Sequence, residues 1–202
     1  MLKNDLFSAR IAKVGLTVEE LQLLLDCCPP HLKPVVLVAV HTGMRKGEIL
    51  KLKWDQVDIR HSFLLLDETK NGERREIPIN RTLYELFAGM PRSLESEYVF
   101  VGKDGEPYGD IKRSFHTALK KAGIRDFHFH DLRHTFASHL VMAGIDLLSV
   151  KELLGHKSLT MTLRYAHLGE KPLKCWIRCL AVVNQKKEFI ICSHFRRMIR
   201  ML

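Results

Sequence analysis

Apolar residues recur every three to four positions along most of this 202-residue chain, which is the spacing of helices that bury one face. Thr17 and Glu20 form a capping box at the start of the first such segment, and Pro29-Pro30 ends it. The segment 34–40 is almost wholly apolar and predicts a buried helix. The predicted helices span residues 17–28, 34–40, 46–52, 81–88, 110–122, 131–143 and 147–154.

After Trp54, the apolar residues recur with a shorter period than that of a helix. Segments 57–59, 63–66 and 75–79 predict three short strands, and Asn71-Gly72 is typical of the turn of a hairpin. The pattern therefore predicts an α+β fold that is mainly α-helical and contains a small three-stranded antiparallel sheet.

The stretch 128–165 contains three consecutive predicted helices, separated by turns at Gly144 and Gly155. The last of the three begins after Ser158 and carries Tyr165. Two short turns fold these helices back on one another. This arrangement can bring the end of the stretch close to its beginning.

Four side chains in this stretch indicate chemistry on a phosphate group. His130 and Arg133 are three residues apart, so they share one face of the first turn of a helix, where the dipole and free N–H groups favour an anion. The folding back brings His156 and Tyr165 toward them. Two imidazoles, a guanidinium and a phenol suit phosphoryl transfer with the phenol as nucleophile. Taken singly, each has a simpler interpretation as a surface arginine, a hydrogen-bonded histidine or a core tyrosine.

Arg45 and Lys70 add two cations to this set. Arg45 lies on the turn between two predicted helices, and Glu48 is placed to orient it. Lys70 lies at the tip of the predicted hairpin, from which a long ammonium side chain can reach over a groove. For Lys70 alone, a solvated turn lysine is the simpler interpretation.

Composition narrows the choice of partner. The chain has 32 lysines and arginines against 23 acidic residues, and its net charge of +9 favours nucleic acid first and an anionic membrane second. No apolar run is long enough to span a membrane, and the N-terminus lacks a signal-peptide core, so we expect a cytoplasmic protein without a membrane partner. The cysteines form no CxxC pair, and we expect reduced thiols. They are Cys27, Cys28, Cys175, Cys179 and Cys192.

The two ends of the chain differ from its middle. Residues 1–16 are interpreted as a linker arm. Residues 169–202 hold eight lysines and arginines and two acids, and so carry +6 of the total +9. This basic tail fits a helix and a hairpin equally well.

Four blocks of the sequence together resemble the catalytic domain of the tyrosine recombinases, the phage integrase family. They are HTGMRKGEILKLKW, TKNGERREIP, HFHDLRHTFAS and LLGHKSLTMTLRYAHL. Their order and spacing are similar to those of the family, and the resemblance implies a catalytic domain at 17–168. It also implies double-stranded DNA as partner and a homotetramer on paired DNA sites, while the state of the free protein stays open.

The resemblance assigns three side chains to the phosphate. Arg45 and Arg133 would be the paired arginines that clamp the non-bridging oxygens, because two guanidinium groups can each bind them bidentately. His156 would donate a hydrogen bond to a phosphate oxygen.

The resemblance assigns three others to bond exchange. Tyr165 would be the nucleophile, and since a free tyrosine has a pKa of roughly 10, His130 would take its proton. Lys70 would protonate the leaving 5′ oxygen. The implied reaction is site-specific DNA recombination, in which a 3′-phosphotyrosyl link stores the bond for the 5′-hydroxyl of a second strand. No metal, ATP or other cofactor is expected, because the arginines supply the positive charge.

Two departures from the family pattern modify this expectation. Integrases usually carry a separate N-terminal DNA-clamping domain, whereas this chain begins near the interdomain linker, so we expect a fragment or shortened product that alone is only partly active. The tail after Gly169 does not resemble the short helix that follows the tyrosine in family members. The sequence names neither the DNA site nor the role, whether phage integration, transposon movement or chromosome-dimer resolution.

Three other functions fit parts of the sequence. A DNA-binding regulator would keep the scaffold without catalysis, and a type IB topoisomerase would share the chemistry but relax supercoils. A zinc hydrolase would use a group of histidines, although neither an HEXXH motif nor a cysteine pair accompanies them. Its candidate ligands are His128, His130, His134 and His139.

Overall fold

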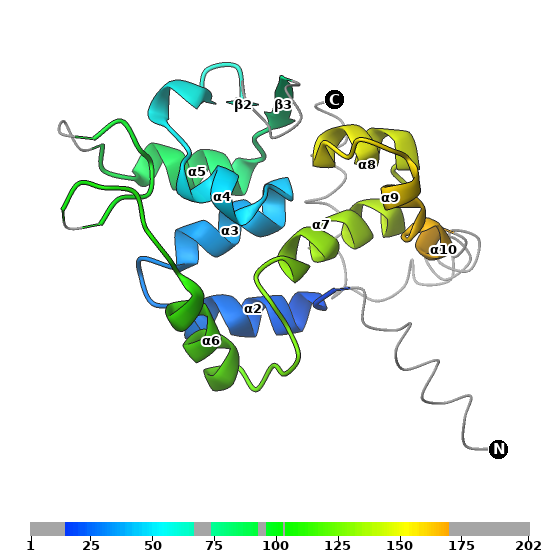
Figure 1. The fold of residues 1–202 in the computed structure, drawn as a ribbon, viewed down its shortest axis with the longest axis horizontal. Coiled ribbons are helices and arrows are strands. Elements are labelled where there is room, and N and C mark those ends of the chain that lie inside the picture. Colours follow the sequence, from blue (N-terminus) through cyan, green and yellow to red (C-terminus); the bar gives the residue numbers. More distant parts are fainter. Residues whose placement is uncertain (1–14, 67–73, 93–95, 103, 170–202) are drawn as a thin grey trace, which may run out of the picture.

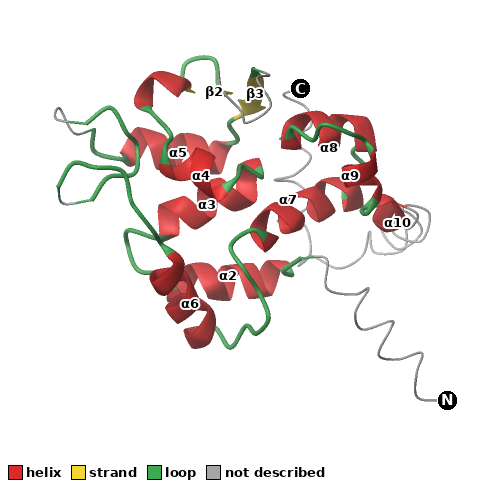
Figure 2. Ribbon diagram, in the orientation of Figure 1, coloured by secondary structure: helices red, strands yellow, loops and turns green. Residues whose placement is uncertain are grey.

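The computed structural model describes residues 15–66, 74–92, 96–102 and 104–169, and the structural statements below concern these residues. Helices dominate them (Figures 1 and 2). The longer helices are α2 (Val18–Cys27), α3 (Lys33–Thr42), α5 (Arg81–Gly89), α6 (Lys112–Lys121), α7 (Asp131–Met142) and α8 (Leu147–Leu154). The shorter ones are α4 (Lys46–Leu50), the 3-10 helix η1 (Trp54–Gln56), α9 (Thr160–Leu163) and α10 (Ala166–Gly169).

Three antiparallel strands form the sheet in the order β1 (Val57–Asp58), β2 (Phe63–Leu66) and β3 (Arg75–Pro78). Leu64 lies opposite Ile77, and Leu66 lies opposite Arg75. All four side chains are buried. The inner face of the sheet therefore holds one charged residue, Arg75, among aliphatic neighbours.

Helix α3 is the centre of the main core. Its sequence is almost wholly apolar, and it packs against α2, α4, α5 and α7. The helix ends at Gly43, whose φ is 63°. A side chain at Gly43 would collide with Phe136 of α7. Glycine at this position therefore permits both the left-handed turn and the close approach of α3 to α7.

Helix α7 belongs to two hydrophobic clusters. Leu132 at its start is part of the main core, whereas Phe136 packs in a second cluster with Leu154 of α8 and with Tyr165. In Figure 1, α7 accordingly runs from the α3 side of the molecule toward α8, α9 and α10. The helix that carries His130 and Arg133 near its first turn is thus held from both sides.

The first described residues, Gly15 and Leu16, lie against the middle of α7. The backbone N–H of Leu16 donates to the hydroxyl of Thr135 at 3.1 Å, and its carbonyl accepts from the Nε2 of His139 at 3.1 Å. The backbone at Gly15 lies so close to Thr135 that an added Cβ would meet its Cα at 2.7 Å. Two hydrogen bonds and one close approach therefore fix the start of the described fold to the middle of α7.

The fold class and most predicted elements are confirmed. The capping box of Thr17 and Glu20 is present at α2, and the three predicted strands form one antiparallel sheet. The helix predicted over 46–52 is shorter, because α4 ends at Leu50.

Two predicted helices differ in detail. The prediction of one helix that begins after Ser158 and carries Tyr165 is wrong: α9 ends at Leu163, α10 starts at Ala166, and Tyr165 lies in the turn between them. Its side chain is 1% exposed, so packing against α7 and α8 takes the place of a continuous helix. The helix predicted from residue 110 begins at 112, and the Asp110 carboxylate accepts the N–H of Lys112 ahead of it.

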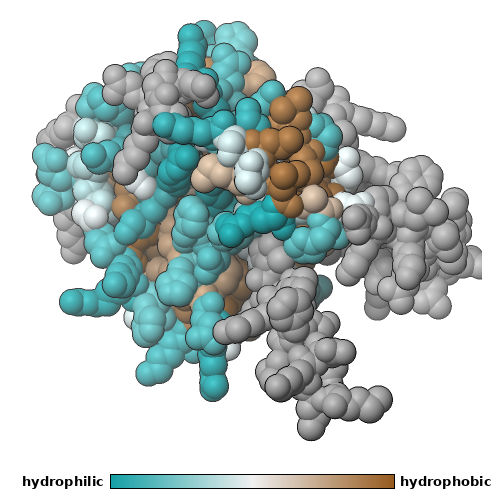
Figure 3. Space-filling model, turned by 45° about the vertical axis from the view of Figure 1, so that its right-hand side comes forward, coloured by the Kyte–Doolittle hydropathy of each residue, from teal (hydrophilic) through white to brown (hydrophobic). Residues whose placement is uncertain are grey.

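Several sequence predictions lie outside the described residues. They concern the linker arm up to residue 14, Lys70, the turn at Asn71-Gly72 and the tail from residue 170. In the described ranges, no helix has both the length and the apolar character needed to cross a membrane. Figure 3 shows a largely hydrophilic face on which apolar side chains gather over the α8 region, where Leu148 is exposed.

Candidate active site

The C-terminal end of α8 collects three guanidinium groups. Gly155, with a φ of 63°, ends this helix. The carbonyl of Leu154 accepts hydrogen bonds from Nη2 of Arg133 at 2.6 Å and from Nη1 of Arg75, and the carbonyl of Gly155 accepts from Nη2 of Arg45 at 3.4 Å. The carbonyl end of a helix carries partial negative charge and so attracts cations.

Glu48 supplies the carboxylate of this group. Its oxygens accept the backbone N–H of Arg45 at 2.8 Å, the Nη1 of Arg45 at 2.7 Å and the Nη2 of Arg75 at 3.0 Å. Burial alone would raise the pKa of Glu48, but these donors and the two positive charges outweigh it and hold that pKa below its usual value. The predicted contact between Glu48 and Arg45 is confirmed. We name the side chains of Arg45, Glu48, Arg75 and Arg133, with the carbonyls of Leu154 and Gly155, the arginine cluster.

Arg133 lies deep in this cluster. Its side chain also donates to the carbonyl of Gly43 at 2.7 Å, and the residue is 4% exposed. Burial, and next the charges of Arg45 and Arg75, lower the pKa of Arg133 to about 10. The cluster holds three guanidinium groups and one carboxylate, so it has an excess of positive charge. An anion bound there would relieve that repulsion.

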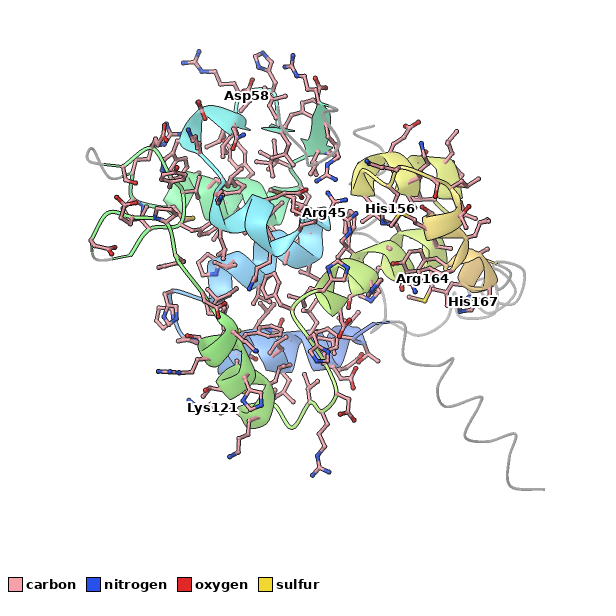
Figure 4. All side chains as sticks on the ribbon, viewed as in Figure 1. Arg45, Asp58, Lys121, His156, Arg164 and His167 are labelled. Carbon is pink, nitrogen blue, oxygen red and sulfur yellow. The ribbon has the colours of Figure 1, made fainter. Side chains whose placement is uncertain are left out.

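His156 lies on the turn directly after α8. In Figure 4, Arg45 and His156 extend into the same region from the start of α4 and from this turn. The Nδ1 of His156 is 2.9 Å from the hydroxyl of Thr162, a hydrogen bond that orients the ring. Burial, together with the charges of Arg133 and Arg45, lowers the pKa of His156 to about 4. The imidazole is therefore neutral at neutral pH.

His130 and His134 stand one turn apart at the start of α7. Their ring centroids are 5.2 Å apart in an edge-to-face arrangement, and the Nδ1 of His134 is hydrogen-bonded to the hydroxyl of Tyr165. Burial lowers the pKa of both histidines, helped by the charge of Arg133 at His130 and of His130 at His134. Burial raises the pKa of Tyr165, against the opposing charges of Arg164 and Arg133. Both members of the His134–Tyr165 pair are thus neutral at neutral pH.

A cavity of about 380 Å³ opens beside the phenol. Arg164, labelled in Figure 4, lines it next to Tyr165. The remaining lining residues are Gly15, Asp126, Phe127, Asp131 and His134. The nucleophile predicted from the sequence therefore borders open space, although its ring is buried.

The structure gathers five of the six predicted site residues. Arg45, Arg133 and His156 meet at the end of α8, and His130 lies close to Arg133, whose backbone N–H donates to the His130 carbonyl at 3.1 Å. Tyr165 contacts His134, the other member of the histidine pair. The sixth residue, Lys70, lies outside the described residues.

Sequence reasoning missed two contacts of this site. Arg75 was predicted only as a strand residue, although its place on the same face as Ile77 could have marked it as a buried charge. His134 was considered only as a metal ligand, and its spacing of four from His130 was the available signal.

The histidines proposed as zinc ligands do not form a group. His139 contacts the Leu16 carbonyl, and the side chain of His128 is 85% exposed. In the ranges that the structure covers, no three His, Cys, Asp or Glu side chains are arranged to hold a metal ion.

The sequence and the fold have counterparts among known proteins. The integrase of Salmonella phage P22 is 34% identical over 169 residues, which cover 76% of this chain and 43% of that protein. The catalytic domain of bacteriophage HP1 integrase superposes with a TM-score of 0.64 at 29% identity, covering 86% of this chain and 98% of that one. A lambda integrase dimer bound to a core site matches with a TM-score of 0.60 at 27% identity, over 73% of this chain and 59% of that one.

The fold is that of tyrosine recombinase catalytic domains. The model of the phage integrase family matches residues 15–171. The chain belongs to the phage integrase family. It spans 43% of the length of the P22 integrase, which is less than half of that relative.

Proposed function

We propose that residues 17–168 form a catalytic domain that cleaves and rejoins DNA strands through Tyr165. The observation that carries this proposal is the convergence of Arg45, Arg133 and His156 on the end of α8, with a phenol and two histidines beside them. Double-stranded DNA is the proposed substrate, and a tetramer on paired sites is the proposed active assembly.

The arginine cluster would hold the scissile phosphate. Each Nη group of Arg45 and Arg133 donates one N–H within the arginine cluster or to the Gly43 carbonyl, and each carries a second N–H that can point to a phosphate oxygen. Charge grows on the non-bridging oxygens as the nucleophile attacks, and preorganised donors stabilise this charge. Neutral His156 would donate from its second ring nitrogen to one of these oxygens.

The bond exchange would proceed in one balanced step. The Tyr165 oxygen forms a bond to phosphorus while the bond from phosphorus to the 5′ oxygen breaks. His130 takes the phenol proton and Lys70 gives a proton to the leaving oxygen. In the structure the phenol contacts His134, so it would turn toward the arginine cluster before it attacks. The reverse step, with the 5′-hydroxyl of another strand, would complete recombination.

A trapping assay tests the proposal. The chain would be incubated with a pool of nicked duplexes of randomised sequence, in which cleavage releases a short 5′-hydroxyl fragment and so blocks rejoining. We expect a protease-sensitive protein–DNA adduct for the natural chain and none for Tyr165→Phe. Sequencing of the trapped DNA would also reveal the preferred site.

The outcomes separate the proposal from its rivals. DNA binding without any adduct would support a non-catalytic regulator. An adduct that persists in Tyr165→Phe would exclude Tyr165 as nucleophile. Relaxation of supercoiled DNA by a monomer would instead favour a topoisomerase.

A further inference from the structure

Arg75 is a buried charge that the proposed chemistry does not use. It begins β3 on the inner face of the sheet, and its side chain is 6% exposed, whereas the side chain of Arg45 is 31% exposed. A charged residue in such a position needs a reason, because removing a guanidinium from water is costly.

Each hydrogen bond of Arg75 goes to a group that also holds one of the two proposed phosphate-binding arginines. Its Nη2 donates to Glu48, whose carboxylate also binds Arg45 twice. Its Nη1 donates to the carbonyl of Leu154, which also accepts from Arg133. Arg75 therefore connects the partner of Arg45 with the partner of Arg133.

The arrangement around Arg75 is unfavourable for stability alone. Its Nε is buried and has no hydrogen-bond partner in the described part of the chain. Burial, and then repulsion from Arg45, outweighs the attraction of Glu48 and lowers the pKa of Arg75. Glu48 and the Leu154 carbonyl would each keep another donor if Arg75 were apolar. Replacing such a buried ion by a well-packed apolar side chain is often neutral or stabilising.

Arg75 donates to Glu48 and to the Leu154 carbonyl, which belong to the arginine cluster. After burial, the charges that lower the pKa of both His130 and His156 include those of Arg133, Arg45 and Arg164. The charge of Arg75 acts on Arg133 and on Glu48. These contacts suit a residue that supports the phosphate-binding groups.

We infer that Arg75 is a positioning residue, which sets the spacing of Arg45 and Arg133 by bridging Glu48 to the carbonyl of Leu154. The inference rests on the proposed function, since the spacing matters only if both arginines bind one phosphate. Arg75 acts on the reaction through these two groups and needs no contact with DNA.

Replacement by methionine tests this role, because methionine fills a similar volume without charge. In Arg75→Met we expect the single-turnover rate of adduct formation at saturating nicked DNA to fall by about 10- to 100-fold, the size of effect that small misplacement of catalytic groups produces. The dissociation constant for DNA should change by less than threefold, and the midpoint of thermal unfolding should stay or rise. Arg75→Lys keeps the charge but reaches only one partner, so it should restore part of the rate.

The controls separate positioning from other roles. Arg81→Met removes an exposed arginine outside the arginine cluster and should change none of these quantities. If Arg75 acts through Glu48, the double variant Glu48→Gln/Arg75→Met should be little slower than the slower single variant. Independent multiplication of the two losses would overturn the inference. A loss of DNA affinity equal to the loss of rate would instead make Arg75 a phosphate anchor, and a lowered unfolding midpoint with an unchanged rate would make it structural.

A measurement without DNA keeps this test apart from the proposed function. NMR of the Arg45 guanidinium reports how fast that group rotates about its Nε–Cζ bond. We expect slow rotation in the natural chain and faster rotation in Arg75→Met, because Glu48 is then held less firmly. Unchanged rotation would overturn the inference even where adducts form. If the natural chain forms no adduct while Arg45 still loosens, the proposed function fails and the positional link stands.

Discussion

The arginine cluster and the His134–Tyr165 pair are held in different ways. In the cluster, each guanidinium makes at least two hydrogen bonds, and Glu48 and the Leu154 carbonyl are shared acceptors. Tyr165 instead lies between two four-residue helices, and its hydroxyl contacts the side chains of His134 and Arg164. The difference suggests that the proposed phosphate site is assembled before DNA arrives, whereas the proposed nucleophile must leave these contacts to reach it.

Removal of the phenol hydroxyl should have the largest effect, because it affects the His134–Tyr165 pair and leaves the arginine cluster intact. Tyr165→Phe should abolish adduct formation while the arginine cluster still binds DNA with unchanged affinity. The Nδ1 of half-buried His134 loses its partner, so the free energy of unfolding should fall by about 1–2 kcal/mol. Gel analysis of trapped DNA and chemical denaturation measure the two effects. Retained adduct would show that another residue attacks.

Loss of one cluster arginine should come next in size. Arg45→Ala and Arg133→Ala should each slow cleavage by about 100- to 1,000-fold, because donors aimed at the developing charge are lost. DNA affinity should fall much less, since other contacts remain. Single-turnover rates and binding isotherms separate the two. Equal losses of rate and affinity would reduce both arginines to phosphate anchors.

Gly155→Ala tests how closely the backbone at the end of α8 packs against Arg75. An alanine there must adopt a left-handed φ and would also collide with the guanidinium of Arg75. Gly123 has a similar φ of 69° with nothing within 4 Å of an added Cβ, and so provides the matched control. Gly123→Ala should cost about 1–2 kcal/mol of stability, and Gly155→Ala should cost more and also slow cleavage. Equal costs in denaturation experiments would mean that Arg75 moves aside freely.

Acid should lower the stability of the fold, because it protonates His156 beside the arginine cluster. Its pKa of about 4 lies below the ordinary value of 6.5, so the unfolded chain binds more protons than the folded one between these pH values. The contribution of neutral His156 to stability is therefore fully present above pH 6.5 and is lost as the pH falls toward 4. We expect the unfolding midpoint to drop by several degrees from pH 7 to pH 5, and His156→Gln to reduce this drop. An identical pH dependence in the variant would assign it to other groups.

The smallest expected effect lies away from both regions. Thr17→Ala removes the hydroxyl that accepts the N–H of Glu20 at 3.2 Å, and should cost about 1 kcal/mol. Cleavage by the folded fraction should not change. Denaturation curves and adduct rates measured on one preparation check this, and a slower rate would show that α2 influences the site.

The sequence was informative where local rules decide the structure. The capping box fixed the start of α2, and glycines marked the ends of α3 and α8. His156 was predicted to approach Arg133, because short turns leave the chain few ways to fold back, and Arg45 was added to them as a paired arginine by the family resemblance. The spacing of residues and the family resemblance supplied this part of the site.

The parts that the sequence did not reveal depend on contacts across the fold. The segment after Ser158 contains no glycine or proline before Tyr165, so nothing local marks the break between α9 and α10; the buried ring produces it. Arg75 follows the alternation of a strand, and only the approach of α8 to β3 shows that its charge has partners. The choice of His134 over His130 as partner of the phenol likewise depends on where the turn at Tyr165 comes to rest.

The attachment of Leu16 to α7 has a mechanical consequence. Thr135 and His139 hydrogen-bond the backbone N–H and C=O of Leu16, two and six residues beyond Arg133 on the same helix. Tension applied through Gly15 would load α7 before any other helix, and would be transmitted to Arg133 as torque on a rigid rod. A pull at this point of the described chain would thus reach the arginine that we propose to bind the phosphate.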